Sequence, residues 1–255
     1  MEKNRTQQIF DRNLAEGRKS LALLLDPDDV EAAALPGILN NAIENKVDFI
    51  FVGGSLVTSD NLSELVRFVK SNSNIPCILF PGNAIQIDAN ADAILFLSLI
   101  SGRNPELLIG QQVVAAPIVK RSGLEVLPTG YMLVNSGRPT SASYVSNTQP
   151  IPNDKPGIAA STAMAGEMLG LKLIYMDAGS GAQDPISPRV IRAVKKNSGL
   201  PLIVGGGINH PAKAKEALLA GADVLVVGNG VQKNLNLLTE VSELVQLTNE
   251  TLNVN

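Results

Sequence analysis

The sequence predicts an α/β fold, a (β/α)8 or TIM barrel, that forms a single domain over residues 1–255. Three observations predict it: eight short apolar runs, helix-like segments between most of them, and glycine-rich turns directly after several runs. Consecutive parallel strands need helical crossovers of this kind. Alternation of strand and helix from end to end favours one domain of 255 residues over two smaller ones.

Each apolar run is predicted to be a buried strand. The runs are rich in Val, Ile and Leu and show no in-and-out alternation, which is typical of barrel strands covered by helices. Their number fits a closed barrel. In chain order they are Ser20–Leu25, Val47–Val52, Cys77–Phe80, Ala93–Leu97, Glu125–Val134, Leu173–Met176, Leu202–Val204 and Val224–Val227.

Local signals predict several helix boundaries. Asp28 is expected to cap a helix that begins near Asp29, and Ser187 to cap a helix that runs to about Asn197. Gly221 is expected to end the helix that precedes the eighth strand.

Two connections depart from the regular pattern. Only Pro81–Asp92 separates the third and fourth runs, about the minimum for a parallel crossover, so we expect an irregular segment in place of the third helix. The segment Asn135–Pro156 is rich in Ser, Thr, Asn and Pro, and loops of this length in compact domains are usually functional lids or disordered. We predict that it is a mobile flap over the mouth of the barrel.

Composition and charge exclude several classes of function. The chain is 45% hydrophobic and 18% charged, with a net charge of −3 and no basic stripe, which argues against nucleic acid as a partner. The single cysteine, Cys77, lies in an apolar run, which excludes internal disulfides and thiolate metal cages. The only histidine, His210, precedes a proline at a helix start, where we expect capping and not acid–base chemistry or zinc binding. No apolar stretch reaches the roughly 18 residues that span a bilayer, so we expect a cytoplasmic protein.

Oxygen-bearing side chains follow the first two strands. Ligand groups of a parallel barrel lie just past the C-terminal ends of its strands. Asp26 follows the first strand directly and is a candidate ligand for a hard cation. Ser55 could complete a magnesium site, because Mg²⁺ takes few protein ligands besides water and substrate phosphates. The alternatives are that Asp26 only supplies negative charge to the next helix, and that Gly53-Gly54-Ser55 is an ordinary turn.

Hydrogen-bond donors cluster after the sixth strand. Gly179 and Gly181 flank Ser180 and offer backbone N–H groups and a hydroxyl to an anion. Tyr175 and Asp177 offer a phenol and a base to a substrate hydroxyl. A purely structural loop would rarely collect so many donors, so this loop predicts a substrate site.

Glycine turns follow the seventh and eighth strands. Gly205-Gly206-Gly207 and Gly228-Asn229 occupy the two loops in which many such barrels bind phosphate through bare backbone amides. This pair of turns is the strongest functional signal in the sequence and predicts a phosphate ester as ligand.

Together these motifs resemble the geranylgeranylglyceryl phosphate synthase family and its heptaprenyl relatives. Family members join a polyprenyl diphosphate to sn-glycerol 1-phosphate with magnesium and make an ether lipid precursor. The resemblance also implies a barrel whose third helix is replaced by an irregular segment. It covers about residues 15 to 235 and rests on the ordered set Leu25-Asp26-Pro27-Asp28, Gly53-Gly54-Ser55, Phe80-Pro81-Gly82-Asn83, Tyr175–Ala182, Gly205-Gly206-Gly207-Ile208 and Gly228-Asn229.

The resemblance implies a role for individual residues. Asp26 and Ser55 would hold Mg²⁺, with Ser55 standing where many members have Thr. Asp177 would be catalytic, and it stands where many members have Glu, which shortens the carboxylate by one methylene. Glycerol phosphate would be bound by Tyr175, Met176, Asp177, Ala178, Gly179, Ser180, Gly181, Gly206, Gly207, Gly228 and Asn229.

The same resemblance implies a mechanism with geranylgeranyl diphosphate as the expected donor. Asp177 would orient the 3-hydroxyl of the glycerol phosphate and take its proton while the allylic carbon becomes cation-like. Arg103 is a candidate contact of the diphosphate, although a surface or helix-start role fits it equally well. Candidates for an apolar trough that holds the prenyl tail, or for plain packing, are Phe96, Leu97, Leu99 and Ile100.

Two alternative functions share the same phosphate site. One is an isomerase, lyase or synthase acting on another phosphate ester, and the other is a barrel that binds a phosphorylated ligand without catalysis. Asp26 and Ser55, and the lack of a Lys after a central strand, argue against several of the former enzymes. We expect a homo-oligomer. Because the expected product is a lipid, transient contact of the protein with a membrane surface is a further expectation. The sequence shows no basic amphipathic helix for such contact.

Overall fold

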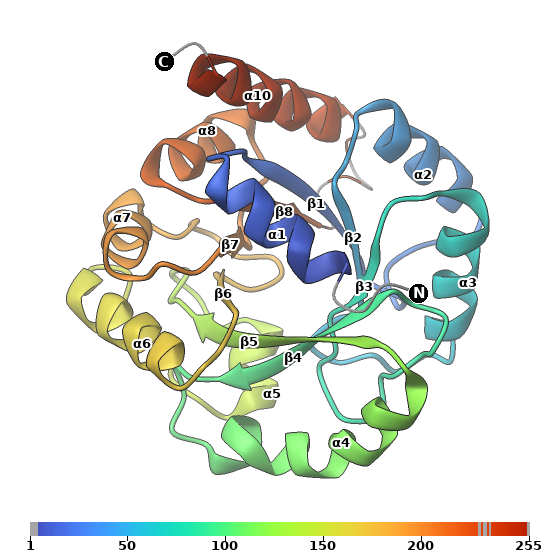
Figure 1. Cartoon of the computed structure of the whole chain (residues 1–255), viewed down its shortest axis with the longest axis horizontal. Coiled ribbons are helices and arrows are strands. Elements are labelled where there is room, and N and C mark those ends of the chain that lie inside the picture. The colour runs from blue at the N-terminus through green and yellow to red at the C-terminus, as the bar shows by residue number, and fades with distance from the viewer. Residues whose placement is uncertain (1–4, 229–230, 232–233, 235, 254–255) are drawn as a thin grey trace.

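Eight parallel strands close into a barrel, which confirms the predicted fold class (Figure 1). The computed structural model describes residues 5–228, 231, 234 and 236–253, and in it each strand pairs with its sequence neighbours while β8 pairs with β1. All eight strands lie within two residues of their predicted bounds. They are β1 (Ser20–Leu25), β2 (Phe49–Val52), β3 (Cys77–Leu79), β4 (Ala93–Leu99), β5 (Glu125–Leu133), β6 (Leu173–Asp177), β7 (Leu202–Gly205) and β8 (Val224–Val227).

Helices surround the barrel in a ring (Figure 1). Residues 80–92, between β3 and β4, contain no helix, as predicted. No helix in the described part of the chain is long and apolar enough to cross a membrane. The ring consists of α2 (Leu35–Glu44), α3 (Leu62–Asn72), the π-helical turn η1 (Glu106–Gly110) with α4 (Gln111–Ser122), α6 (Pro156–Met168), α7 (Pro188–Asn197), α8 (Pro211–Ala220) and α10 (Asn236–Asn253).

The predicted caps of α7 and α8 are confirmed. The Ser187 hydroxyl accepts a hydrogen bond from the backbone N–H of Val190, and His210 Nδ1 accepts one from Ala212. Gly221 ends α8 with a φ of 110°. The only histidine is therefore a capping residue.

The predicted helix near Asp29 is wrong, because α2 begins only at Leu35. Asp28 instead accepts hydrogen bonds from the backbone N–H and hydroxyl of Thr58, at 2.7 and 2.9 Å, and from the N–H of Ser59. The carboxylate that was expected to cap a helix thus ties the loop after β1 to the loop after β2. The local sequence around Asp28 could not predict these partners, because they lie on the loop after another strand.

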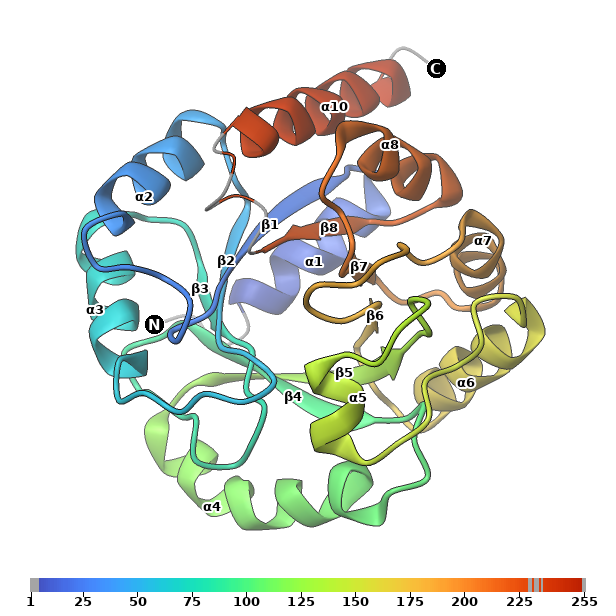
Figure 2. The same cartoon turned by 180° about the vertical axis from the view of Figure 1, so that it is seen from behind.

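The N-terminal end of the barrel is closed by α1 (Arg5–Ala15), which crosses it in the foreground of Figure 1. Phe10 stacks on Phe49 with ring centroids 4.4 Å apart. The backbone N–H groups of Thr6 and Gln7 donate to the carboxylate of Glu125 at the start of β5. The open end of the barrel is therefore the opposite one, which Figure 2 shows.

Aromatic rings fill the barrel from this plug to the open end. Each ring contacts the next, with centroid distances between 4.4 and 6.4 Å. A second, larger apolar core lies between the strands and the helices and contains Cys77, which is fully buried. The rings of the inner column are Phe10, Phe49, Phe51, Tyr175, Phe80 and Tyr131.

Candidate active site

Two adjoining cavities lie at the C-terminal end of the strands. The larger, the mouth cavity, has a volume of about 800 Å³ and is lined by the loops after β1, β2, β6, β7 and β8. The smaller, the apolar cavity, has a volume of about 130 Å³. Four residues line both: Gly54, Ser55, Phe80 and Val145. The mouth cavity brings together most of the site predicted from the sequence: Asp26, Ser55, Tyr175, Asp177, Gly179, Ser180, Gly181, Gly206, Gly207 and Gly228.

Asp177 is the last residue of β6 and the acidic group at the base of the mouth cavity. Its side chain is almost fully buried, and both of its oxygens accept hydrogen bonds. Oδ1 accepts from the N–H of Gly179 at 2.7 Å, and Oδ2 accepts from the hydroxyl of Tyr131 at 2.5 Å. Burial raises the pKa of Asp177, and the bonds from Tyr131 and Gly179 partly oppose this rise. A carboxylate with a raised pKa is a stronger base than an exposed aspartate.

The glycine turn after β7 packs directly on the loop after β6. The N–H of Ala178 donates to the carbonyl of Gly205 at 3.0 Å. Gly206 and Gly207 have φ angles of 79° and 70°, which favour glycine. A β-carbon at Gly206 would lie 2.6 Å from the nitrogen of Gly179, so no side chain fits there. The loop after β6 and the turn after β7, both of which the resemblance assigned to glycerol phosphate, are therefore in contact.

Three residues that were predicted to bind glycerol phosphate are not among the described residues that line the mouth cavity. Asn229 lies outside the described residues, and of its motif Gly228 does line the mouth cavity. Met176 and Ala178 do not line it, because their side chains point into the apolar core behind the strands. Only the backbone of these two residues is available to a ligand in the mouth.

Asp26 and Ser55 lie on adjacent loops at the rim. Asp26 is half-buried, and its Oδ1 accepts a hydrogen bond from the N–H of Asp28 at 3.0 Å. Burial raises the pKa of Asp26 to about 6; the hydrogen bond from Asp28 opposes this rise, and the charges of Asp29 and Asp28 add to it. A β-carbon at Gly54 would clash with Asp26 Oδ2, so the glycine lets the backbone that carries Ser55 approach the carboxylate.

The charges that face the mouth cavity are negative. Asp26, Asp28, Asp29 and Asp177 line it, whereas no Lys, Arg or His is found among the described residues that line either cavity. Among the described lining residues, the groups that can hold an anionic ligand are therefore backbone N–H groups and hydroxyls, and a bound cation could add to them. A divalent cation at the rim would also relieve the repulsion between the carboxylates.

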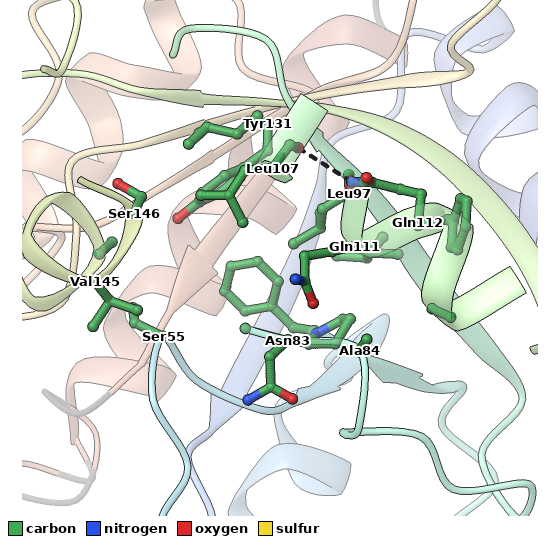
Figure 3. A pocket seen from close by; sticks show the side chains of 18 of the residues that line it. Ser55, Asn83, Ala84, Leu97, Leu107, Gln111, Gln112, Tyr131, Val145 and Ser146 are labelled. Atoms are coloured by element: carbon green, nitrogen blue, oxygen red, sulfur yellow. Dashed lines mark hydrogen bonds between the residues drawn. The ribbon is translucent and has the colours of Figure 1, made fainter. Parts of the chain in front are cut away.

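The apolar cavity extends from the rim toward η1 and α4 (Figure 3). Of the four residues expected to form an apolar trough, Phe96, Leu97 and Leu99 line it, and they belong to β4 itself. Ile100 does not line it and instead approaches Gly130 and Gly166. Further walls come from the segment after β3, from η1 and α4, and from β5: Ala84, Ile87, Leu107, Ala115, Tyr131 and Leu133.

The expected flap, Asn135–Pro156, does lie at the mouth, but it is more regular than expected. It contains the helix α5 (Ser141–Ser146), over the strands in Figure 2, and Thr140 and Ser143 form reciprocal capping hydrogen bonds at its start. Thr140 also packs against Gly179, and Arg138 donates to the carbonyl of Gly181. The predicted mobility of this segment stays a prediction.

Arg103, the candidate contact of a diphosphate, lines neither cavity. It is exposed, and its Nη1 donates to the carbonyls of Ile100 and Gly102. The structure thus gives no support to a ligand contact by Arg103.

Comparisons with known proteins identify relatives of this chain. Residues 14–245 match the model of the PcrB family. The chain belongs to the PcrB family. It is 55% identical over 236 residues to the geranylgeranylglyceryl phosphate synthase of Spirosoma linguale, which covers 92% of this chain and 95% of that protein. The enzyme of the same name from Korarchaeum cryptofilum is 42% identical over 227 residues, 89% of this chain and 93% of that protein.

A solved structure from such an enzyme superposes on nearly the whole chain. The crystal structure of (S)-3-O-geranylgeranylglyceryl phosphate synthase from Thermoplasma acidophilum, in complex with its substrate sn-glycerol-1-phosphate, has a TM-score of 0.89 and 31% sequence identity. The superposition covers 97% of this chain and 100% of that one.

One residue of this PcrB-family site escaped sequence analysis. Tyr131 lies on β5 inside a long apolar run and binds Asp177 on the neighbouring strand. A buried tyrosine usually finds a partner for its hydroxyl, which is the only sequence signal that pointed to it. The partner depends on the register of β5 against β6, where Leu133 pairs with Asp177. Register between parallel strands joined by a long crossover cannot be read from one sequence.

Proposed function

We propose that this protein transfers a polyprenyl group, geranylgeranyl in the first instance, from its diphosphate to the 3-hydroxyl of sn-glycerol 1-phosphate. The products are an ether lipid precursor and diphosphate. The observation that carries the proposal is the junction of the two cavities at Gly54, Ser55, Phe80 and Val145. A mouth suited to a phosphate ester opens there into a pocket suited to a hydrocarbon. The names of the relatives and the sn-glycerol-1-phosphate bound to the Thermoplasma acidophilum enzyme support the same assignment.

In this proposal the acceptor binds in the mouth cavity. Its phosphate accepts hydrogen bonds from the turns Gly179–Gly181 and Gly206-Gly207, with Gly228 and Asn229 completing the site. Positive φ angles at Gly179, Gly181, Gly206 and Gly207 support an anion-binding role, because turns of this kind expose successive N–H groups. Tyr175 and Asp177 then face the glycerol hydroxyls.

The donor lies across the junction. Its apolar tail occupies the cavity lined by Phe96, Leu97 and Leu99, and its diphosphate remains at the rim near Asp26 and Ser55. This places the allylic carbon between the two cavities, close to the acceptor hydroxyl. Holding both reactants in this way makes their encounter effectively intramolecular.

We propose Mg²⁺ as the cofactor, held by Asp26 and Ser55. The raised pKa of Asp26 and the absence of a cationic side chain among the described lining residues support the fit, because a divalent cation would stabilise this carboxylate. Two oxygen-bearing side chains suffice for this ion, because Mg²⁺ takes few protein ligands besides water and substrate phosphates. When bound, Mg²⁺ would neutralise negative charge that develops on the diphosphate leaving group.

Asp177 acts as the base of the reaction. The bond from the glycerol oxygen to the allylic carbon forms, the bond from that carbon to the diphosphate oxygen breaks, and the hydroxyl proton passes to Asp177. The burial of its carboxylate supports this role, because burial raises its pKa and a raised pKa favours proton acceptance.

A two-substrate assay tests the proposed function. Purified protein is incubated with labelled sn-glycerol 1-phosphate, geranylgeranyl diphosphate and Mg²⁺, and the label is then extracted into butanol. We expect an extractable ether product only when both substrates are present. Folded protein that forms no such product would contradict the proposal.

Two aspartate variants distinguish a catalytic protein from one that only binds a phosphorylated ligand. Asp177→Asn is expected to lower kcat by about 10²- to 10⁴-fold, to a residual activity that can still be measured, while sn-glycerol 1-phosphate still binds in calorimetry. Asp184→Asn is the matched control, because Asp184 lies on the same loop but lines neither cavity. It should behave like the parent protein.

A further inference from the structure

Tyr131 lies between the two cavities of the site. Its side chain lines the apolar cavity, whereas Asp177, to which it donates a hydrogen bond, lines the mouth cavity. Figure 3 shows Tyr131 on the wall of the apolar cavity, near Leu107. The residue therefore stands where the proposed donor and the proposed base meet.

The ring of Tyr131 is held in one orientation. It meets the ring of Phe80 edge-on, with centroids 5.8 Å apart and planes at 67°. It meets the ring of Tyr175 in the same way, at 5.5 Å and 85°. Only 9% of the residue is exposed. A side chain fixed on two sides loses little entropy on making a hydrogen bond, so the hydroxyl is preorganised toward Asp177.

The hydrogen bonds of Asp177 define its geometry. Among the described residues, the donors to its carboxylate are Gly179, at Oδ1, and Tyr131, at Oδ2. Gly179 belongs to the glycine loop, which the proposed acceptor contacts, whereas Tyr131 lies on β5, which pairs with β6 in the barrel. Tyr131 is thus the fixed reference that orients the carboxylate.

We propose that Tyr131 is a positioning residue for the acceptor step, which orients Asp177 through a hydrogen bond to Oδ2 and so directs its basic lone pair toward the substrate hydroxyl. The inference deepens the proposed function and rests on it. In the step, the proton leaves the glycerol hydroxyl for Asp177, and the proton of Tyr131 stays on its own oxygen. The hydrogen bond also opposes the rise in the pKa of Asp177 that burial causes.

The substitution Tyr131→Phe tests the inference with little effect on packing, because both ring contacts are kept. We expect kcat to fall by about 10²-fold, within the usual range for a misaligned acid–base group. The KM values of both substrates should change by less than about 3-fold, since the phosphate and prenyl contacts remain. The acid limb of the kcat–pH profile should move to higher pH, because the lost bond lowered the pKa of Asp177.

A second variant separates positioning from direct contact. Because Tyr131 is inferred to act only through Asp177, Tyr131→Phe should cause no further loss in an Asp177→Asn background. Tyr144→Phe is the control. Tyr144 is exposed on α5 and is not among the described donors to Asp177, so its substitution should leave the acid limb in place.

Several results would overturn the inference. The first is a kcat of Tyr131→Phe near the parental value, or an effect on KM alone. The second is an acid limb of the kcat–pH profile that does not move. The third is a loss of activity that adds to the loss caused by Asp177→Asn. A parent protein without prenyl transfer would refute the proposed function and this inference together. An active parent that the Tyr131→Phe change does not affect would refute the inference alone.

Discussion

Gly206 lies directly against Asp177, so that a β-carbon at position 206 would come within 2.7 Å of Asp177 Oδ1. The same β-carbon would lie 2.7 Å from the nitrogen of Ala178 and 2.6 Å from that of Gly179. The turn after β7 and the loop after β6 therefore form one unit. The proposed phosphate anchor and the proposed base are held in fixed relation because no side chain separates them.

Gly206→Ala is expected to disrupt this unit. The new methyl group must push the loop after β6 away, and the KM for sn-glycerol 1-phosphate should rise more than about 10-fold, which corresponds to about 1.4 kcal/mol of binding. Steady-state kinetics with varied acceptor measures the effect.

Gly123→Ala is the matched control for this change. Gly123 has a φ of 76°, but no described atom lies within 4 Å of the place that a β-carbon would take, so alanine there meets only backbone strain. Such strain costs about 1 kcal/mol. The substitution should lower thermal stability and leave the KM unchanged. If both substitutions raised the KM equally, close packing around Gly206 would not be the cause of the rise.

The rim residues should control the magnesium requirement. Asp26→Asn removes the proposed charged ligand and is expected to raise the Mg²⁺ concentration for half-maximal activity by about 10-fold or more. Ser55→Ala should have a smaller effect in the same direction, and Ser55→Thr, which keeps the hydroxyl, should have almost none. Full activity after exhaustive treatment with EDTA would refute the proposed magnesium site.

The size of the apolar cavity should select the donor. Ala115 lines it from α4, and Ala115→Leu fills part of its volume. We expect kcat/KM to fall about 10-fold more with geranylgeranyl diphosphate than with geranyl diphosphate, because a few methylenes in a packed pocket are worth about 1 to 3 kcal/mol. The neighbouring Ala116 is exposed, so Ala116→Leu should leave the ratio of the two donors unchanged. A ratio that responds equally to both substitutions would show that the tail binds elsewhere.

Burial of Asp177 has a consequence for stability against pH. Because its pKa is raised in the folded state, the folded protein holds this proton to higher pH than the unfolded chain does. The folded protein therefore loses stability as the pH rises from about 4, the pKa of an ordinary aspartate, through the raised pKa of Asp177. The melting temperature of Asp177→Asn minus that of the parent should increase as the pH rises above about 4. A difference that does not depend on pH would mean that burial does not destabilise the ionised form of Asp177.

The sequence predicted the barrel because each of its signals is local. The runs from Ser20–Leu25 to Val224–Val227, the short link after β3 and the cap at His210 all depend on neighbours in the chain. The glycine turns were also recognisable, since only their place after β7 and β8 was needed. These features therefore agree with the structure.

Features that depend on contacts between distant segments could not be predicted in the same way. Asp28 was expected to cap a helix, but it binds Thr58 and Ser59 on another loop. Tyr131 looked like one more apolar strand residue, because the register of β5 against β6 decides that it meets Asp177. Both cases involve partners that only the closure of the barrel brings together.

A crystal structure of this protein with sn-glycerol 1-phosphate bound would show where the phosphate and the reacting hydroxyl lie. We expect the phosphate to accept hydrogen bonds from the turns Gly179–Gly181 and Gly206-Gly207 while the 3-hydroxyl lies within hydrogen-bond distance of Asp177. A phosphate bound at the rim beside Asp26, or a glycerol whose 3-hydroxyl points away from Asp177, would contradict the proposed site.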